Sequence, residues 1–319
     1  MTRSTSLTFL LTSTLSLISH AALAADPPTQ TGLITSRTLE TEAGQAGGGT
    51  VVPAQATNRT TDEDRDDRSI NLAQPDYTVI DLPTTLRLPR RKGAFRVTHR
   101  FGRPLGQGTF GDLASDLFSI DSGALIGLEY RYGIMRGTQI GIYRTTDKTI
   151  EFFGQYDAIR QGERRPVTVD ALVSVEGTNN FGASAERSVG ARHEYSPALG
   201  AIVSRTVGTH AAVYLEPIWV GHSNLFSPTD PHDNTFIVGL GARLRVRPSV
   251  YVVGAWTPRA AGYHPGVSLK TFGIEKRLGG HSFQLNFSNS LGTTLGQMAR
   301  GGGNHRDWFM GFNISRKFY

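Results

Sequence analysis

The chain has 319 residues, with 33 Lys and Arg against 27 Asp and Glu, 37 Gly and no Cys. The absence of Cys excludes a disulfide scaffold and thiolate-bound zinc. The net charge of +6 is modest, and no basic run with interleaved aromatic residues occurs, so the sequence argues against a nucleic-acid partner.

The first 24 residues predict a secretory signal peptide. Arg3 precedes an apolar stretch, and the small residues Ala22 and Ala24 flank Leu23 as in a cleavage site. No later apolar run approaches the roughly 20 residues of a membrane-spanning helix. We therefore expect a chain that leaves the cytoplasm without a helical membrane anchor.

Residues 25–76 predict a disordered periplasmic linker. The segment combines Gly, Thr, Pro and alternating charges with no apolar period. Its acidic run at 62–67 is interrupted by Arg65 and lacks the spacing of a calcium-binding loop. A solvated linker is therefore favoured over a calcium site.

From residue 77 onward the sequence alternates with the period of a β-strand. In the clearest segment Val169, Val173 and Val175 fall on one face, and Asp170 and Glu176 fall on the other. About twelve such segments follow one another, at residues 95–101, 124–132, 137–145, 149–158, 166–176, 197–207, 210–220, 235–246, 249–256, 267–276, 281–290 and 307–318. The number rises if residues 77–88 also pair.

Strands with one apolar and one polar face fit either a soluble β-sandwich or a membrane barrel. Many of these strands have the length that a tilted strand needs to cross a bilayer, about 9–11 residues, whereas strands of soluble proteins are usually shorter. Long and short connections also alternate along the chain, which is typical of outer-membrane barrels. We therefore predict an all-β, transmembrane, antiparallel up-and-down β-barrel of about 12 strands over residues 77–319.

Aromatic side chains are predicted to mark the two membrane interfaces. Trp residues end or begin strands at the outer rim, and Tyr and Phe residues lie at the periplasmic rim. The predicted interface residues are Trp219, Trp256, Trp308, Tyr130, Tyr132, Tyr156 and Phe318. We expect contact with the lipid bilayer of the outer membrane of a Gram-negative bacterium.

The final strand is expected to pair with the first and so close the barrel. Residues 307–319 also resemble the aromatic-rich terminal strand that the bacterial barrel-assembly machinery reads. Here Phe318 is penultimate and Tyr319 is last, so the parity of the lipid-facing residues is shifted by one. The assembly machinery is the partner expected during insertion.

The stretch from Phe95 to Pro104, followed by the Leu-Glu-Tyr run at 128–130 and the turn at 146–149, resembles the DUF5777 family of predicted membrane β-barrel proteins. The resemblance extends from about Tyr77 to Tyr319. It implies the fold and the membrane setting, and it implies no activity and no catalytic residues.

Charged side chains fall on the strand face that is predicted to line the lumen. They either neutralise one another and fill the lumen or line a narrow pore, and the balanced signs argue against strong ion selectivity. The predicted lumen-lining charges are Arg96, Arg100, Glu129, Arg131, Glu151, Asp170, Glu176, Glu216, Arg243 and Arg245.

Several His residues fall in predicted long loops, near Asp230 and Asp233. Imidazole and carboxylate groups suit divalent metals, but no paired ligand spacing occurs. We predict no metal site and no cofactor, with His222, His232, His264 and His305 as weak alternatives beside His193.

An outer-membrane lipid-acting hydrolase is the enzymatic alternative. His99 is expected on the apolar face of the first strand, whereas Asn286 and Ser288 are expected to point inward. No nucleophile motif is present. We predict a non-enzymatic barrel that acts as a narrow channel for a small solute or as a structural and binding barrel. A barrel that docks a periplasmic partner through the linker is the remaining alternative.

Overall fold

The structure is a computed structural model that describes residues 68–178, 195–225, 229–263 and 265–319. The predicted signal peptide, the linker as far as residue 67, and the two residues His193 and His264 lie outside the described residues.

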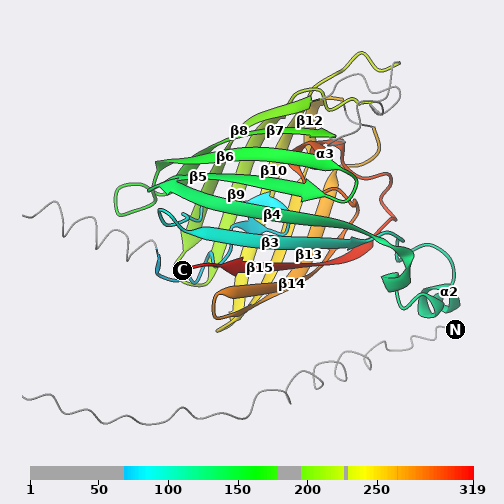
Figure 1. Ribbon diagram of the computed structural model, residues 1–319, viewed down its shortest axis with the longest axis horizontal. Helices are drawn as coiled ribbons and strands as arrows, with labels where there is room; N and C mark the ends of the chain where they lie inside the picture. Colours follow the sequence, from blue (N-terminus) through cyan, green and yellow to red (C-terminus); the bar gives the residue numbers. More distant parts are fainter. Residues whose placement is uncertain (1–67, 179–194, 226–228, 264) are drawn as a thin grey trace, which may run out of the picture. The chain divides into compact units, whose positions relative to one another are not determined.

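Twelve long antiparallel strands form a closed barrel (Figure 1). Each wall strand pairs with its neighbour in sequence, and the last pairs with the first, so no wall strand has a free edge. The strands are β3 (Gly93–Phe101), β4 (Ala124–Met135), β5 (Thr138–Thr145), β6 (Thr149–Ile159), β7 (Thr168–Thr178), β8 (Tyr195–Val207), β9 (Ala211–Val220), β10 (Thr235–Arg247), β11 (Val250–Thr257), β13 (Leu269–Leu278), β14 (His281–Ser288) and β15 (Phe309–Lys317). The predicted fold class is confirmed, and the alternative of a soluble β-sandwich is wrong because the sheet closes on itself.

Shorter elements accompany the wall in the described residues, among them a 3-10 helix at Ile120–Ser122. The strands β1 (Thr78–Val79) and β2 (Leu82–Pro83) pair only with each other, so residues 77–88 add no strand to the barrel. The strand β12 (Arg259–Gly262) extends the sheet beside the end of β10. The helices α2 (Phe110–Ser115) and α3 (Leu295–Arg300) lie in connections that the sequence analysis left without structure.

The two faces of the wall have opposite chemistry. Large apolar side chains such as Leu128, Phe152 and Leu199 point outward and are 50%, 53% and 59% exposed, whereas Arg100 and Glu216 point inward and are fully buried. A soluble protein buries its apolar face, so this inverted pattern is that of a barrel in lipid. Within the described segments, no helix is long and apolar enough to cross a membrane.

The barrel has a short-turn end and a long-loop end. Turns such as 136–137 and 279–280 join strands at the first, and connections such as 102–123 and 289–308 join them at the second. Trp219, Trp256 and Trp308 lie near the long-loop end, and Tyr130, Tyr132, Tyr156 and Phe318 lie toward the short-turn end. All except the partly exposed Trp308 are well exposed, as expected for side chains at a membrane interface.

Candidate functional site in the barrel lumen

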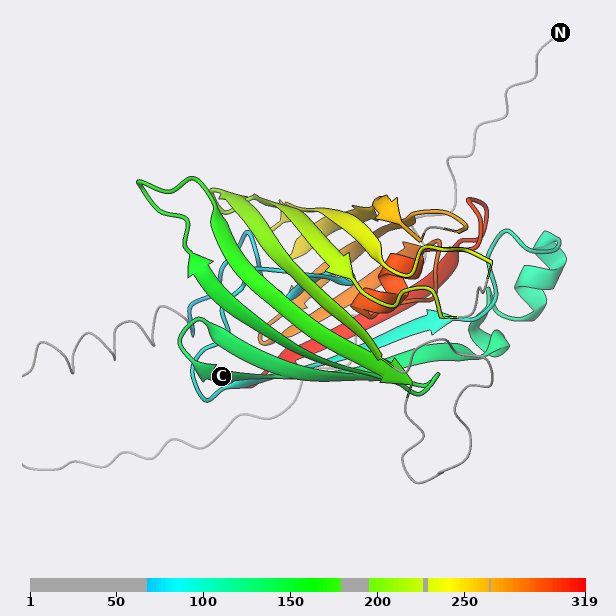
Figure 2. The same ribbon diagram turned by 90° about the horizontal axis from the view of Figure 1, so that it is seen from above.

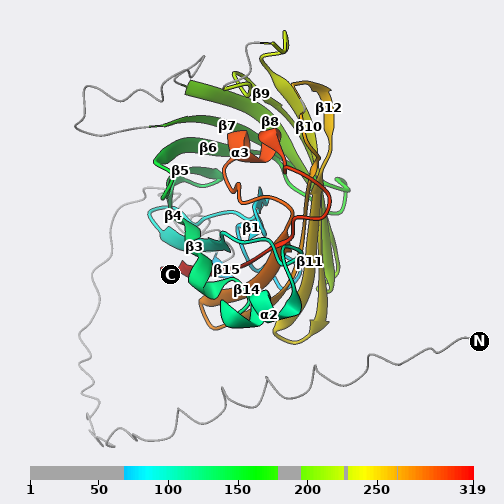
Figure 3. The same ribbon diagram turned by 90° about the vertical axis from the view of Figure 1, so that its right-hand side faces the viewer.

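Two segments that are not part of the wall lie inside the lumen (Figures 2 and 3). The first is a hairpin, residues 76–88, which contains β1 and β2 and which we call the lumen hairpin. The second is the loop that carries α3. Seen from the end, the ring of wall strands surrounds both β1 and α3 (Figure 3).

The lumen hairpin turns at Ile80 and Asp81, between the paired residues Val79 and Leu82. The amide of Thr84 donates to the carbonyl of Tyr77 over 2.9 Å, and the Thr84 hydroxyl donates to the carbonyl of Asp76 over 2.9 Å. These bonds keep the two limbs together. The predicted boundary between linker and barrel, at residue 76, falls within buried chain, because Ala73 and Gln74 are already buried.

Ile80 at the tip has a backbone φ of 60°. A β-branched residue rarely adopts this left-handed conformation. The carbonyl of Ile80 accepts hydrogen bonds from Arg96 (2.8 Å) and from the Asn313 amide (3.0 Å). The wall therefore fixes the tip in a strained conformation through donors on β3 and β15.

Wall side chains also donate to backbone carbonyls along the rest of the hairpin. Arg243 donates to Thr78 over 2.7 Å and Gln155 donates to Thr84 over 2.7 Å. The hydroxyl oxygens of Thr85 and Ser204 lie 2.5 Å apart. The carbonyls of Thr78 and Thr84 are thus paired by wall side chains rather than by a neighbouring strand.

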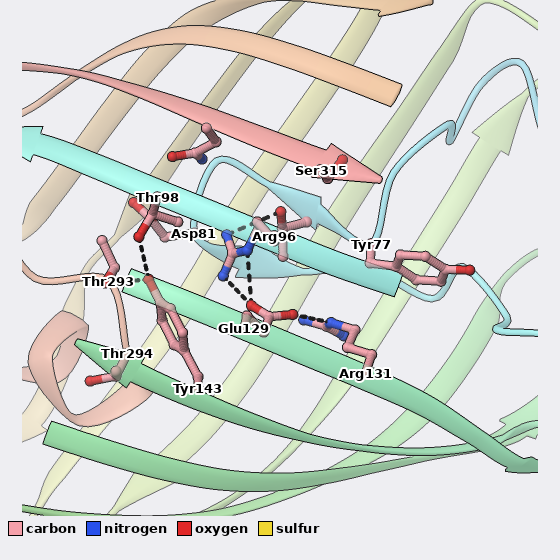
Figure 4. Close-up of polar contacts among 12 residues, drawn as sticks. Tyr77, Asp81, Arg96, Thr98, Glu129, Arg131, Tyr143, Thr293, Thr294 and Ser315 are labelled. Atoms are coloured by element: carbon pink, nitrogen blue, oxygen red, sulfur yellow. Dashed lines mark hydrogen bonds and ion pairs between the residues drawn. The ribbon is translucent and has the colours of Figure 1, made fainter. Parts of the chain in front are cut away.

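Charged pairs surround the tip. The Nη2 of Arg100 donates to both carboxylate oxygens of Asp81, over 2.8 and 3.0 Å. Glu129 accepts from Arg96 over 2.8 Å and from Arg131 as well (Figure 4). Buried charges are tolerated when they are paired and hydrogen-bonded in this way.

A glycine on β10 makes room for the hairpin. A Cβ at Gly239 would lie 2.9 Å from Leu82 of the hairpin. Val79, Ile80 and Leu82 pack there in a buried apolar cluster that also includes Leu295 and Met298 of the α3 loop. The two filling segments therefore share one apolar core with inward-facing apolar side chains of the wall, among them Ile202, Ile218 and Ile237.

The helix α3 fills the lumen near the long-loop end. A capping box begins it, with the Thr294 side chain accepting from the Gln297 amide and the Gln297 side chain accepting from the Thr294 amide. The amide of Gly296 donates to Glu176 over 3.0 Å, and Arg300 donates to the same carboxylate over 3.0 Å. Glu176 of the wall therefore contacts both ends of the helix.

Tyr143 joins the wall to the α3 loop. Its hydroxyl lies 2.6 Å from the hydroxyl of Thr98 and 2.6 Å from that of Thr293 (Figure 4). Between the hairpin tip and the α3 loop remains a cavity of about 30 Å³, lined in part by Asp81 and Leu295. A cavity of this size holds one or two water molecules, so the hairpin tip and the α3 loop pack closely at this level of the lumen.

Some inward polar atoms have no protein partner in the described part of the chain. They include both carboxylate oxygens of Glu216, the Arg243 Nε, and side-chain oxygens of Thr271, Ser282 and Asn286. These atoms lie on β9, β10, β13 and β14. Buried polar groups normally find a partner, so this side of the wall is suited to water or solute.

The structure places nine of the ten predicted lumen charges in the buried inner face: Arg96, Arg100, Glu129, Arg131, Glu151, Asp170, Glu176, Glu216 and Arg243. Arg245 differs. It is half-buried near the short-turn end and donates to the carbonyl of Pro248 over 3.1 Å. Glu275, which was not among the predicted lumen charges, is fully buried and accepts from Arg243 over 2.8 Å.

Among the loop histidines that the structure describes, His222 and His232 have different partners. His222 contacts the carbonyl of Tyr195 and His232 contacts Asp230, each through its Nδ1, while His305 lies in the 301–308 loop. Over the described ranges, no three His, Asp or Glu side chains are arranged to hold a metal ion.

The residues of the hydrolase alternative lie on opposite faces of the wall. His99 points outward and stacks on Phe312, with the ring centroids 4.7 Å apart. Asn286 and Ser288 are fully buried on the inner face. His99 therefore cannot act together with either residue without a rearrangement of the wall.

Residues 76–318 match a family model described as a membrane-bound β-barrel domain. This match covers all twelve wall strands and the lumen hairpin. No curated protein matches the chain.

Solved membrane barrels are similar to this chain at low identity. The NanC porin is 7% identical, with 72% of this chain and 99% of that chain covered and a TM-score of 0.43. An outer-membrane channel of Pseudomonas putida F1 is 11% identical, with 72% and 97% covered and a TM-score of 0.40. The outer-membrane phospholipase A of Escherichia coli is 9% identical, with 77% and 95% covered and a TM-score of 0.37.

Proposed function

The chain belongs to the DUF5777 family of membrane-bound β-barrel domains, and we propose that it is an outer-membrane channel closed at rest by the lumen hairpin and the α3 loop. The observation that carries this proposal is the small cavity of about 30 Å³ between two segments that are not part of the wall. The channel opens when at least the hairpin moves.

The outer membrane of a Gram-negative bacterium is the location that fits this barrel. A predicted signal peptide, an apolar outer face and aromatic residues at both rims support it. The short-turn end then faces the periplasm, and the long-loop end faces the exterior. The barrel-assembly machinery is the partner that would insert such a chain.

The hairpin can leave the lumen without opening the wall. β1 and β2 share no strand pairing with the barrel, and the hairpin contacts the wall mainly through side-chain donors and its apolar cluster. Behind it, the wall presents Arg, Glu, Asn, Ser and Thr side chains beside the apolar cluster, and this polar part suits a hydrated path for a small solute.

The proposal is non-enzymatic. The groups that an outer-membrane hydrolase would need to combine, His99 with Asn286 or Ser288, are separated by the wall itself. Docking of a periplasmic partner through the predicted linker is compatible with the channel, since the hairpin directly follows that segment in sequence.

A reversible disulfide across the hairpin and the wall tests the proposal. The sequence has no Cys, so T85C/S204C introduces the only thiols, at positions where the native hydroxyl oxygens lie 2.5 Å apart. That spacing approaches the ~2.05 Å of a disulfide. Single-channel currents are measured in planar bilayers under applied voltage, before and after addition of a reductant.

We expect the oxidised double variant to stay silent and the reduced one to open as the wild type does. The single variants T85C and S204C, treated in the same way, control for the substitutions and for the reductant. Equal currents in the oxidised and reduced double variant would overturn the proposal, as would silence of every folded form.

A further inference from the structure

We propose that Arg100 is a binding site for a carboxylate-bearing anion and that Asp81 of the lumen hairpin occupies this site at rest. A solute carboxylate would replace Asp81, release the hairpin and pass through the opened lumen. This inference rests on the proposed channel function and names the class of solute.

Arg100 has the surroundings of a built anion site. It is fully buried, and Asn313 fixes one side of its guanidinium by accepting from Nη1 over 2.9 Å. Nη2 donates to both oxygens of Asp81. The Nε of Arg100 has no partner among the described residues, so the site retains a further donor. A guanidinium held in this way suits a carboxylate.

Arg100 differs from the other arginines that contact the hairpin. Arg96 keeps Glu129 on the wall, and Arg243 keeps Glu275, when the hairpin leaves. Among the residues that the structure describes, Asp81 is the only acidic side chain paired with Arg100. Withdrawal of the hairpin therefore leaves an unpaired positive charge on the inner wall.

The surroundings of Asp81 allow it to be displaced. Asp81 sits beside the strained residue Ile80, and it lines the cavity of about 30 Å³ together with Arg131. The Nη1 of Arg131 is buried and has no hydrogen-bond partner in the part of the chain that the structure describes. The cavity is too small for an organic anion, so such an anion can bind only where Asp81 has moved away.

Two substitutions break the same ion pair and leave opposite charges. D81N leaves the wall cation Arg100 unpaired, whereas R100Q leaves Asp81 unpaired on the hairpin. Both variants are made in the full chain, and their folding is checked by heat-modifiable migration in gels. Currents are recorded across a potassium chloride gradient, and succinate binding in detergent micelles is measured by calorimetry, with 1,4-butanediol as the neutral control.

We expect both variants to open more often than the wild type. The reversal potential of D81N should shift toward the chloride equilibrium potential and that of R100Q should not. D81N should bind succinate at least about tenfold more tightly than the wild type, because the tethered Asp81 no longer competes. R100Q should not bind it, and butanediol should bind to neither.

The outcomes separate this inference from the channel proposal. Opening of both variants with equal selectivity and no succinate binding would overturn the anion site and leave the gated channel. Succinate binding by D81N without current in any variant would support the site and overturn the channel. Absence of both current and succinate binding would overturn both the channel and the anion site.

Discussion

The hydroxyl oxygen of Tyr77, at the start of the lumen hairpin, lies 2.8 Å from that of Tyr319, two residues beyond the last wall strand. Lys317 lies over the Tyr77 ring, with its amine 5.1 Å from the ring centroid. This cluster fixes the hairpin where it enters the lumen at the short-turn end. The position of the hairpin thus depends on Tyr77, an ionisable residue outside the membrane-spanning strands.

Alkaline solution should weaken the attachment of the hairpin at this cluster. Burial, followed by the neighbouring Tyr319 hydroxyl, raises the pKa of Tyr77 well above its usual value near 10. A raised folded-state pKa contributes stability that is fully present below about pH 10 and is lost as the pH rises through the folded-state value. We expect the apparent free energy of unfolding to fall above pH 10 in the wild type and to fall less in Y77F. An equal fall in Y77F would contradict this assignment.

Gly296 is predicted to be essential for the packing of α3 against Glu176. A Cβ at this position would overlap the carboxylate of Glu176, whereas the nearest atom to a Cβ at Gly303, in the same loop, is 3.9 Å away. G296A should therefore destabilise the protein by about 1–3 kcal/mol, as overpacking does in cores. G303A should be close to neutral. Urea unfolding of the two variants checks this, and equal stabilities would show that the loop adapts freely.

The loop before β4 should lose its order in acid. Hydrogen bonds from the Thr109 backbone and side chain lower the pKa of Asp112, and the bond from the Ser119 amide, followed by that from Arg103, lowers the pKa of Asp116. Depressed values contribute stability that is present above the unfolded pKa near 4 and is lost as the pH falls through the folded value. Amide exchange over 109–119 should accelerate, relative to intrinsic rates, below pH 4. D112N should show part of that acceleration already at pH 6. Unchanged protection of the wild type below pH 4 and of D112N at pH 6 would refute the prediction.

Glu216 and Glu275 should respond in opposite ways to the same substitution. Both are fully buried in the wall, but neither oxygen of Glu216 has a partner within the described ranges, whereas Glu275 accepts from Arg243. E216M should be neutral or should stabilise by about 1–3 kcal/mol, since it removes an unsatisfied polar group. E275M should destabilise by about 3–5 kcal/mol, since it leaves Arg243 buried without its partner. Thermal unfolding of the two variants is the measurement, and a large loss in E216M would indicate an unrecognised partner.

The wall strands could be predicted because the alternation of apolar and polar residues that marks each strand is local in sequence. Alternation such as that of Val169 and Asp170 assigns each strand and its inner face without knowledge of its neighbours. The lumen hairpin could not be predicted in this way. The acceptors are the hairpin's own backbone carbonyls, which every sequence possesses, and the donors Arg96, Gln155 and Asn313 lie on three different wall strands.

Two signals for the filled lumen were nevertheless present. Thr294 and Gln297 have the spacing of a capping box, which indicates a helix start in the last long loop. Gly239 and Gly241 occupy inward positions of β10, where a missing side chain leaves room for Leu82. Small residues on the inner face therefore mark where another segment packs.

The pairing of the first wall strand, β3, with the last, β15, has a consequence for how the barrel folds. Arg100 and Asn313 bond across β3 and β15 although 213 positions separate them, and Asp76 bonds Ser315 across 239 positions. Such distant pairing is entropically costly and slow. The hairpin adjoins β3 in the chain and already presents Asp76 and Ile80 to β15. It can therefore act as an internal template that captures the last strand, so that ring closure and filling of the lumen become one kinetic step.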